Sequence, residues 1–134
     1  MNDANSLEDW AERYAKAWCS HNPDKVAAFY ASSGSISLNG APPVSIAEVA
    51  RGFMRDFPDL VVKFDRLEKR ETGVEFHWTF AGTNTGPAGT GNRVRISGYE
   101  LWKIDDAGLI AQSTGHFDVT EYERQLRSRD GAPM

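Results

Sequence analysis

The chain has 134 residues, of which 40% are hydrophobic and 11% aromatic, so it can build the core of one domain and is not a disordered chain. Its formal net charge of -4 gives no support for nucleic-acid binding, which usually requires a basic face. No segment approaches the roughly 20 apolar residues of a membrane span, and the N-terminus lacks the features of a signal peptide, so we expect no membrane partner and a cytoplasmic location.

The first 30 residues have the apolar spacing of helices. Ser6 and Asp9 resemble a capping box, and apolar residues then recur at helical intervals, which predicts a helix that stops near His21. Pro23 occupies a favoured first-turn position and predicts a second, shorter helix. Tyr30 is expected to face inward from that helix.

A third helix is predicted after a short strand around Ile36 and Leu38. Ser45 and Glu48 form another capping-box pattern, and apolar residues follow on one side of the segment. Pro58 ends this helix, because the residue before a proline is disfavoured in the helical conformation.

From residue 60 onward the apolar period changes from helical to two, which predicts strands. They run from Leu60 to a turn at Thr72-Gly73, from Val74 to Phe80, from about Arg93 to Ile104, and from Ala111 to Asp118. A short final helix follows. We therefore expect one α+β domain over 1–134, with an ordered core at about 6–127, a frayed tail at 128–134, and the helices packed on one face of a curved antiparallel sheet.

Glu100 is a candidate acid–base residue on the predicted strand 93–104. Its face of the strand is otherwise apolar, since it is shared with Val94, Ile96, Gly98, Trp102 and Ile104. A desolvated carboxylate has a raised pKa, which suits a general acid or base. The alternative is a structural Glu100 that pairs with Arg93 or Arg95, or that a bulge at Gly98 turns outward.

The stretch AQSTGHFD (111–118) places four polar side chains on one face of its strand: Gln112, Thr114, His116 and Asp118. This face could line a cavity. A carboxylate beside an imidazole fixes the tautomer of the ring and raises its basicity, as acid–base catalysis requires. The alternative is a polar edge or a dimer interface in which these groups satisfy one another.

Aromatic residues with polar tips offer further pocket walls. Tyr14, Trp18 and Tyr30 recur at helical spacing, which makes them core residues first and lining of a pocket second. A metal site is not predicted, because His21, His77 and His116 are scattered and the single Cys19 forms no CxxC.

Three segments resemble a known family: FPDLVVKFDRL (57–67), HWTFAGTNTG (77–86), and SGYELWKIDDAGLIAQ (97–112) with a closing FD (117–118). Together they are similar to the SnoaL-like polyketide cyclase group of the nuclear transport factor 2-like superfamily, over nearly the whole domain. The resemblance implies a cone, in which a strongly curved antiparallel sheet wraps around two or three helices and leaves a pocket at the open end. It also implies dimers through the outer sheet face. Some members are cofactor-free enzymes that use a carboxylate or a His–Asp pair, and many others bind ligands or have no established activity.

The chain departs from the family at two positions. Where polyketide cyclases of the group carry a histidine, near the start of RISGYEL, the nearest match is Ser97. Their acidic residue falls near Gln112 by gap counting, and Asp118 is the next carboxylate on that face.

Three functions remain open from the sequence. The first is a cofactor-independent enzyme that acts on a small hydrophobic, carbonyl-bearing molecule by proton abstraction and return, with Asp118 or Glu100 taking the proton while His116 and Tyr30 orient or donate. The second is a non-catalytic pocket for a small apolar ligand. The third is a dimeric interaction module. A homodimer is expected in any case, because the strands carry apolar groups on both faces and the helices cover only one.

Overall fold

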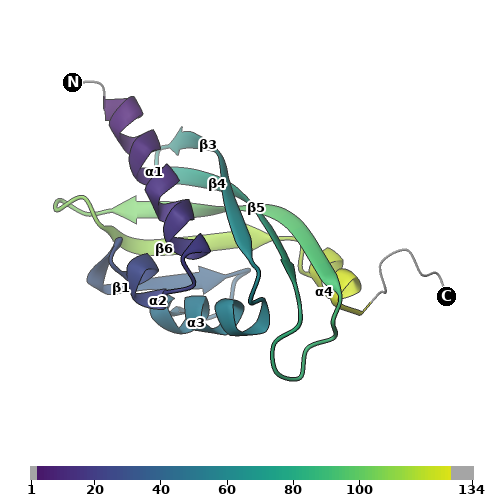
Figure 1. The fold of residues 1–134 in the computed structure, drawn as a ribbon. Helices are drawn as coiled ribbons and strands as arrows, with labels where there is room; N and C mark the ends of the chain where they lie inside the picture. Colours follow the sequence, from purple (N-terminus) through teal and green to yellow (C-terminus); the bar gives the residue numbers. More distant parts are fainter. Residues whose placement is uncertain (1–2, 128–134) are drawn as a thin grey trace.

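The computed structural model describes residues 3–127, and the predicted tail at 128–134 lies outside the described residues. The helices are α1 (Asp3–Cys19), α2 (Pro23–Ala27), α3 (Ile46–Asp56) and α4 (Val119–Arg127). The strands are β1 (Tyr30–Leu38), β2 (Val44–Ser45), β3 (Val61–Arg70), β4 (Gly73–Thr83), β5 (Arg93–Ile104) and β6 (Ile110–Phe117). The expected α+β class is confirmed (Figure 1).

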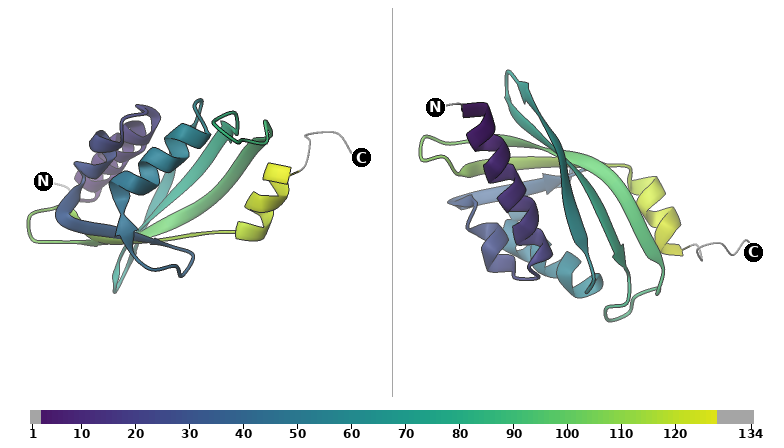
Figure 2. Two further views of the ribbon diagram at one scale, coloured as in Figure 1. Left: turned by 90° about the horizontal axis from the view of Figure 1, so that it is seen from below. Right: turned by 45° about the horizontal axis from the view of Figure 1, so that its top comes forward.

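The six strands form one curved sheet in the order β2-β1-β6-β5-β4-β3. From β3 to β6 every neighbouring pair is antiparallel, as expected, whereas β1 and β6 are parallel. Helices α1, α2 and α3 lie together on one side of the sheet, which bends around them (Figure 2). We call the face toward these helices the inner face and the opposite one the outer face.

The region before the first strand differs from the prediction in three places. Helix α1 begins at Asp3, so Ser6 lies within the helix and does not cap it. Helix α2 has the expected N-terminus, where the Asn22 side chain accepts a hydrogen bond from the Asp24 backbone, but it ends at Ala27. Tyr30 therefore starts β1 instead of ending a helix, because Tyr30 and residues 35–38 gain backbone pairing with β6.

Aromatic side chains fill the space between α1 and the inner face. Tyr14 on α1 meets the rings of Phe76 and Trp102 edge-on, with centroids 5.2 Å away in both cases. Phe76 and Trp102 stack on each other at 4.9 Å, and all three residues are fully buried. Edge-to-face and offset contacts of this kind add to the stabilisation from burial, so they fix α1 against β4 and β5.

Helix α4 covers the end of the sheet near the start of β5. The Gln125 side chain accepts a hydrogen bond from the Arg95 backbone N–H and donates one to the Arg95 carbonyl oxygen, so it pairs with β5 as a neighbouring strand would. The Tyr122 ring lies 5.6 Å from Phe117 and 6.4 Å from Phe57. This helix therefore closes one end of the space under the sheet.

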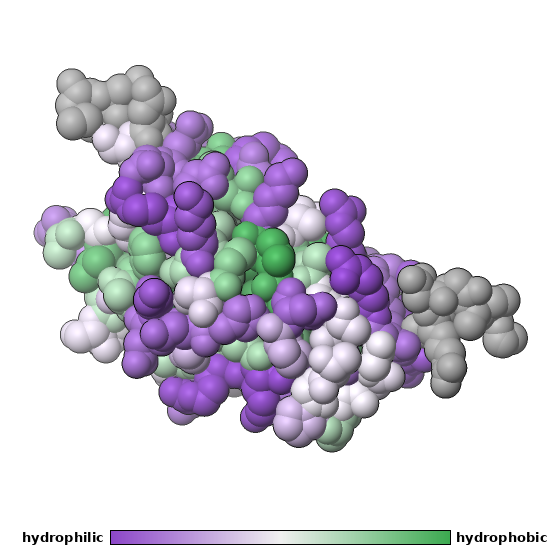
Figure 3. Space-filling model, viewed as in Figure 1, coloured by the Kyte–Doolittle hydropathy of each residue, from purple (hydrophilic) through white to green (hydrophobic). Residues whose placement is uncertain are grey.

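Most side chains on the face that carries the helices are hydrophilic, with a hydrophobic patch near its centre (Figure 3). Among the described residues, none of the helices has both the length and the apolar character needed to cross a membrane.

Candidate active site

Glu100 lies on the inner face of β5, in the phase that the sequence predicts. Burial alternates along the strand, and Glu100 is only 6% exposed. The pairing of β5 with β4 and β6 runs through Gly98 without a register shift, so no bulge turns Glu100 outward. Arg93 and Arg95 are exposed on the strand. Neither structural alternative for Glu100 therefore holds.

One oxygen of the Glu100 carboxylate is held by side chains from α1, β1, β5 and β6. Oε1 accepts hydrogen bonds from Trp102 Nε1 at 2.9 Å, Tyr14 Oη at 3.0 Å, Ser113 Oγ at 3.0 Å and Tyr30 Oη at 3.5 Å. All four donors are uncharged. The carboxylate is therefore fixed in position without an arginine or lysine partner among the described residues.

Burial raises the pKa of Glu100 above its usual value, because a charged carboxylate loses its hydration there. The hydrogen bonds from Trp102, Tyr14, Ser113 and Tyr30 stabilise the charged form and reverse only part of this increase. A raised pKa makes the carboxylate a stronger base than an ordinary one, which suits a group that accepts a proton and then returns it.

The second oxygen, Oε2, is not held by protein donors in this way. It has no hydrogen-bond partner among the described residues, and it is not among their fully buried unpaired atoms. Glu100 borders a cavity of about 50 Å³, room for several water-sized groups. The other lining residues are Trp18, Ile36, Leu38, Val49, Phe53, Val62, Phe76, Trp78, Phe80, Ile96, Phe117 and Tyr122. A buried carboxylate at the wall of a nearly apolar cavity is thus the central feature of the site.

Of the three aromatics predicted from helical spacing, only Trp18 borders the cavity. Tyr14 and Tyr30 lie behind Glu100, where their hydroxyl oxygens are 3.0 Å apart. Burial and the nearby charge of Glu100 raise the pKa of both phenols, so both stay protonated and can donate. The expectation that Tyr14 and Tyr30 line the pocket is wrong, and they instead position the carboxylate.

The predicted polar face of β6 points away from the cavity. Ile104 pairs with Ile110, but Lys103 pairs with Gln112, so Ala111 is an extra residue at a bulge. One inserted residue exchanges the two faces of the rest of the strand. Gln112, Thr114 and His116 therefore lie on the outer face, while Ser113 points inward to Glu100.

Asp118 and His116 both lie away from the cavity and contact groups that stabilise the fold. Asp118 is exposed, and its Oδ1 accepts a hydrogen bond from the Glu121 backbone at 3.0 Å, which caps α4. The His116 ring lies 4.9 Å from Tyr99 on the outer face. Ser97 is also on that face, with its hydroxyl 2.8 Å from Thr79. The placement of Asp118, His116 and Ser97 at the cavity is wrong.

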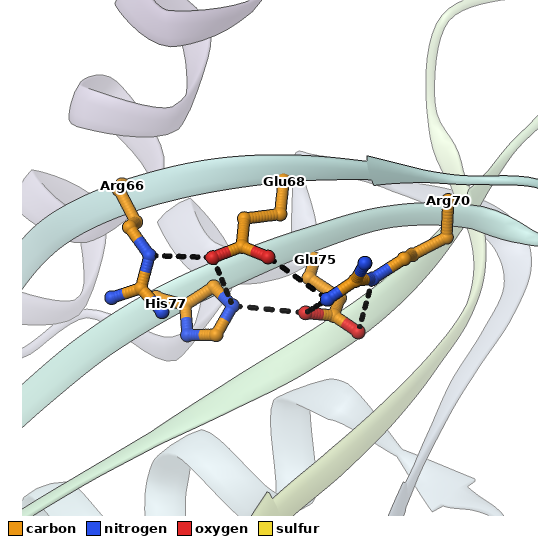
Figure 4. Close-up of polar contacts among 5 residues, drawn as sticks. All are labelled: Arg66, Glu68, Arg70, Glu75 and His77. Carbon is orange, nitrogen blue, oxygen red and sulfur yellow. Dashed lines mark hydrogen bonds and ion pairs between the residues drawn. The ribbon is translucent and has the colours of Figure 1, made fainter.

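A charged network covers part of the outer face (Figure 4). The His77 ring lies 2.9 Å from Glu75, Arg70 bridges Glu75 and Glu68, and Arg66 pairs with Glu68 at 2.7 Å. Ligand atoms of Glu68, Glu75 and His77 fall within 4.8 Å of one another, a grouping that the linear spacing of the histidines does not reveal. Both carboxylates are already bonded to arginines, which lower their pKa values.

The sequence reading missed several residues that make the site. Ser113 and Trp102 hold Glu100, and Trp78 and Phe117 wall the cavity. The alternation of β4 and β5 contained a signal for Trp78 and Trp102, because both lie on apolar faces. Ser113 could be predicted as a site residue only with knowledge of the bulge at Ala111, and that bulge has no clear signature in the sequence.

Solved structures of other proteins share this fold. TsrD from Streptomyces laurentii superposes with a TM-score of 0.78 at 21% identity, covering 95% of this chain and 98% of that one. An LEH-like epoxide hydrolase of M. tuberculosis gives 0.70 at 19% identity, covering 93% and 92%. A protein with a ketosteroid isomerase-like fold from Catenulispora acidiphila, in complex with trimethylamine, gives 0.73 at 13% identity, covering 85% and 88%. These identities establish a common fold.

The sequence itself gives the family. No curated protein sequence matches the chain significantly. Residues 8–126, which include the Glu100 strand and most of the helix that carries Tyr14, match the SnoaL-like polyketide cyclases. With nearly the whole described region matched, the chain belongs to the SnoaL-like polyketide cyclase family.

Proposed function

We propose that the protein is a cofactor-independent acid–base enzyme that acts on a small hydrophobic, carbonyl-bearing substrate, with Glu100 as the proton-transfer group. The observation that carries the proposal is that the two oxygens of the Glu100 carboxylate have different surroundings. Oε1 is held by uncharged donors from four elements, while Oε2 has no hydrogen-bond partner among the described residues and Glu100 borders an apolar cavity.

In the proposed reaction, Oε2 of ionised Glu100 takes a proton from the carbon next to the carbonyl group. The C–H bond breaks, an O–H bond forms, and the electron pair moves into an enolate whose charge lies on the carbonyl oxygen. Return of the proton to another carbon of a conjugated enolate gives isomerisation. Attack of the enolate on a second carbonyl of the same molecule gives ring closure, and Glu100 then donates its proton to the new alkoxide. Neither course requires a cofactor.

The apolar lining supports this chemistry in two ways. It favours a hydrophobic substrate, because binding removes apolar surface from water. It also strengthens the electrostatic interactions of the carboxylate with the reacting atoms, since little water screens them. Tyr14, Tyr30, Ser113 and Trp102 keep the carboxylate in one orientation throughout.

Deuterium exchange tests the proposal without knowledge of the natural substrate. A panel of cyclic ketones in D₂O, followed by proton NMR, reports how fast the hydrogens beside the carbonyl are replaced. We expect the protein to accelerate exchange of at least one cavity-sized ketone well above the buffer rate. Ketones that bind without faster exchange would instead favour a non-catalytic ligand-binding domain, the alternative to which the apolar cavity is also suited.

A further inference from the structure

Trp78 carries a polar group that the proposed proton transfer does not use. Its indole Nε1 is the one fully buried side-chain nitrogen or oxygen without a hydrogen-bond partner among the described residues. Buried donors are nearly always paired, so an unpaired one in a binding region calls for an explanation. Trp102 provides the contrast, because its indole nitrogen donates to Glu100 at 2.9 Å.

The sheet places Trp78 beside the reactive carboxylate. Trp78 pairs with Gly98 and Phe76 pairs with Glu100, so Trp78 and Glu100 are diagonal neighbours on the inner face. Such positions are about 7–8 Å apart, close enough for one small molecule to touch both. Trp78 and Glu100 both border the cavity.

Gly98 makes room for the indole. A Cβ atom at this position would lie 2.7 Å from Cζ2 of Trp78 and would also collide with the carbonyl oxygen of His116. Only glycine therefore lets the indole lie over β5 in this position. The centroids of the Trp78 and Phe117 rings are 6.0 Å apart. Since Nε1 is covered in this structure, contact with a ligand requires a movement of the indole or of the side chains that cover it.

We propose that Trp78 Nε1–H donates a hydrogen bond to an acceptor oxygen of the molecule that occupies the cavity. In the proposed reaction this oxygen is the carbonyl oxygen on which the enolate charge develops, and the N–H group would stabilise that charge. Trp78 would thereby select ligands that carry an oxygen acceptor over hydrocarbons of the same shape. The inference takes the cavity as the binding site from the proposed function, but it concerns binding, so its test does not depend on turnover by Glu100.

A matched pair of probes tests this inference. Cyclohexanone and methylenecyclohexane have nearly the same shape, and only the ketone has an acceptor oxygen. Each is titrated into ¹⁵N-labelled protein, and the indole N–H resonance of Trp78 is identified by its loss in Trp78→Phe or, should that variant not fold, by its through-space contacts to Phe117. We expect cyclohexanone to move this resonance downfield and methylenecyclohexane to leave it nearly unchanged. A Trp78 resonance that cyclohexanone does not move, or that both probes move equally, would overturn the inference.

Affinities of the variants provide a second test. Trp78→Phe should weaken cyclohexanone binding by about fivefold to tenfold, the worth of one hydrogen bond, and should leave methylenecyclohexane binding nearly unchanged. Tyr122→Phe is the matched control, because it removes a different hydrogen-bonding tip from the cavity wall while keeping the aromatic ring. An equal loss for both probes in Trp78→Phe would show a packing role only. A Trp78 response that persists in Glu100→Gln would uphold this inference even if Glu100 proved inactive.

Discussion

Tyr14 Oη donates a 3.0 Å hydrogen bond to Glu100 Oε1, which joins the first helix to the fifth strand across 86 positions of the chain. Both residues are buried, and the same carboxylate oxygen also receives Trp102, Ser113 and Tyr30. Side chains from four elements thus meet at one carboxylate oxygen, and Glu100 also borders the cavity. The predictions below follow from this arrangement.

The raised pKa of Glu100 predicts a pH-dependent cost of folding. A carboxyl whose pKa is higher in the folded state than its ordinary 4.5 holds its proton more tightly when folded. The stabilisation from this group is therefore complete below about pH 4.5 and is lost as the pH rises through the folded-state pKa. Glu100→Gln removes this dependence, so the variant should gain stability relative to the wild type as the pH rises. Urea midpoints of both proteins between pH 4 and 8 measure the effect: the midpoint of Glu100→Gln minus that of the wild type should rise with pH, and a difference that stays constant or falls would contradict the prediction.

The two tyrosine hydroxyls should tune the protonation of Glu100. Tyr14→Phe removes the donor at 3.0 Å and Tyr30→Phe the weaker one at 3.5 Å. Each loss destabilises the charged carboxylate, so the pKa of Glu100 should rise in both variants, and more in Tyr14→Phe. A ¹³C NMR titration of the Glu100 carboxyl carbon reports this directly. A pKa that stays the same or falls in Tyr14→Phe would rule out the positioning role.

Asp118 should matter to α4 and not to proton transfer. Its side chain caps this helix, so Asp118→Ala should lower the free energy of unfolding by about 1 kcal/mol. Asp118→Asn keeps an acceptor oxygen and is the matched control, with most of the stability retained. Thermal unfolding of the two variants distinguishes them. Equal stability of Asp118→Ala and the wild type would show that the cap contributes nothing.

The expected homodimer remains a prediction. The outer face, through which it would form, carries fewer apolar side chains than the sequence led us to expect. On β4 and β5 the apolar members of this face are Ala81, Tyr99 and Leu101, set among charged and polar side chains. Light scattering should give twice the 14.9 kDa of one chain for the wild type. Leu101→Lys should give a monomer, while Val44→Lys, on the exposed strand β2, should not. A monomeric wild type at high micromolar concentration would exclude this dimer.

From the sequence, the class of fold and the buried carboxylate Glu100 could be predicted, whereas the faces of β6 and the place of Tyr30 could not. Glu100 was found because β5 alternates without interruption, so its face could be counted from Val94 to Ile104. On β6 the pattern did not show which face is buried. The bulge at Ala111 exchanges the two faces, and both faces carry enough polar side chains to be taken for the wall of a cavity. Tyr30 was assigned to a helix because its strand gains stability from a partner 80 positions later, which local patterns do not contain.

The central claim is that Glu100, and not Asp118, moves the proton. The most direct measurement is the rate of deuterium exchange into the best ketone found for the wild type, compared in Glu100→Gln and Asp118→Asn at equal protein concentration. Both changes replace a carboxylate by an amide of the same shape. We predict a loss of roughly a hundredfold or more in Glu100→Gln, the range for a general acid–base group, and an unchanged rate in Asp118→Asn. Full exchange activity in a folded Glu100→Gln protein would contradict the account.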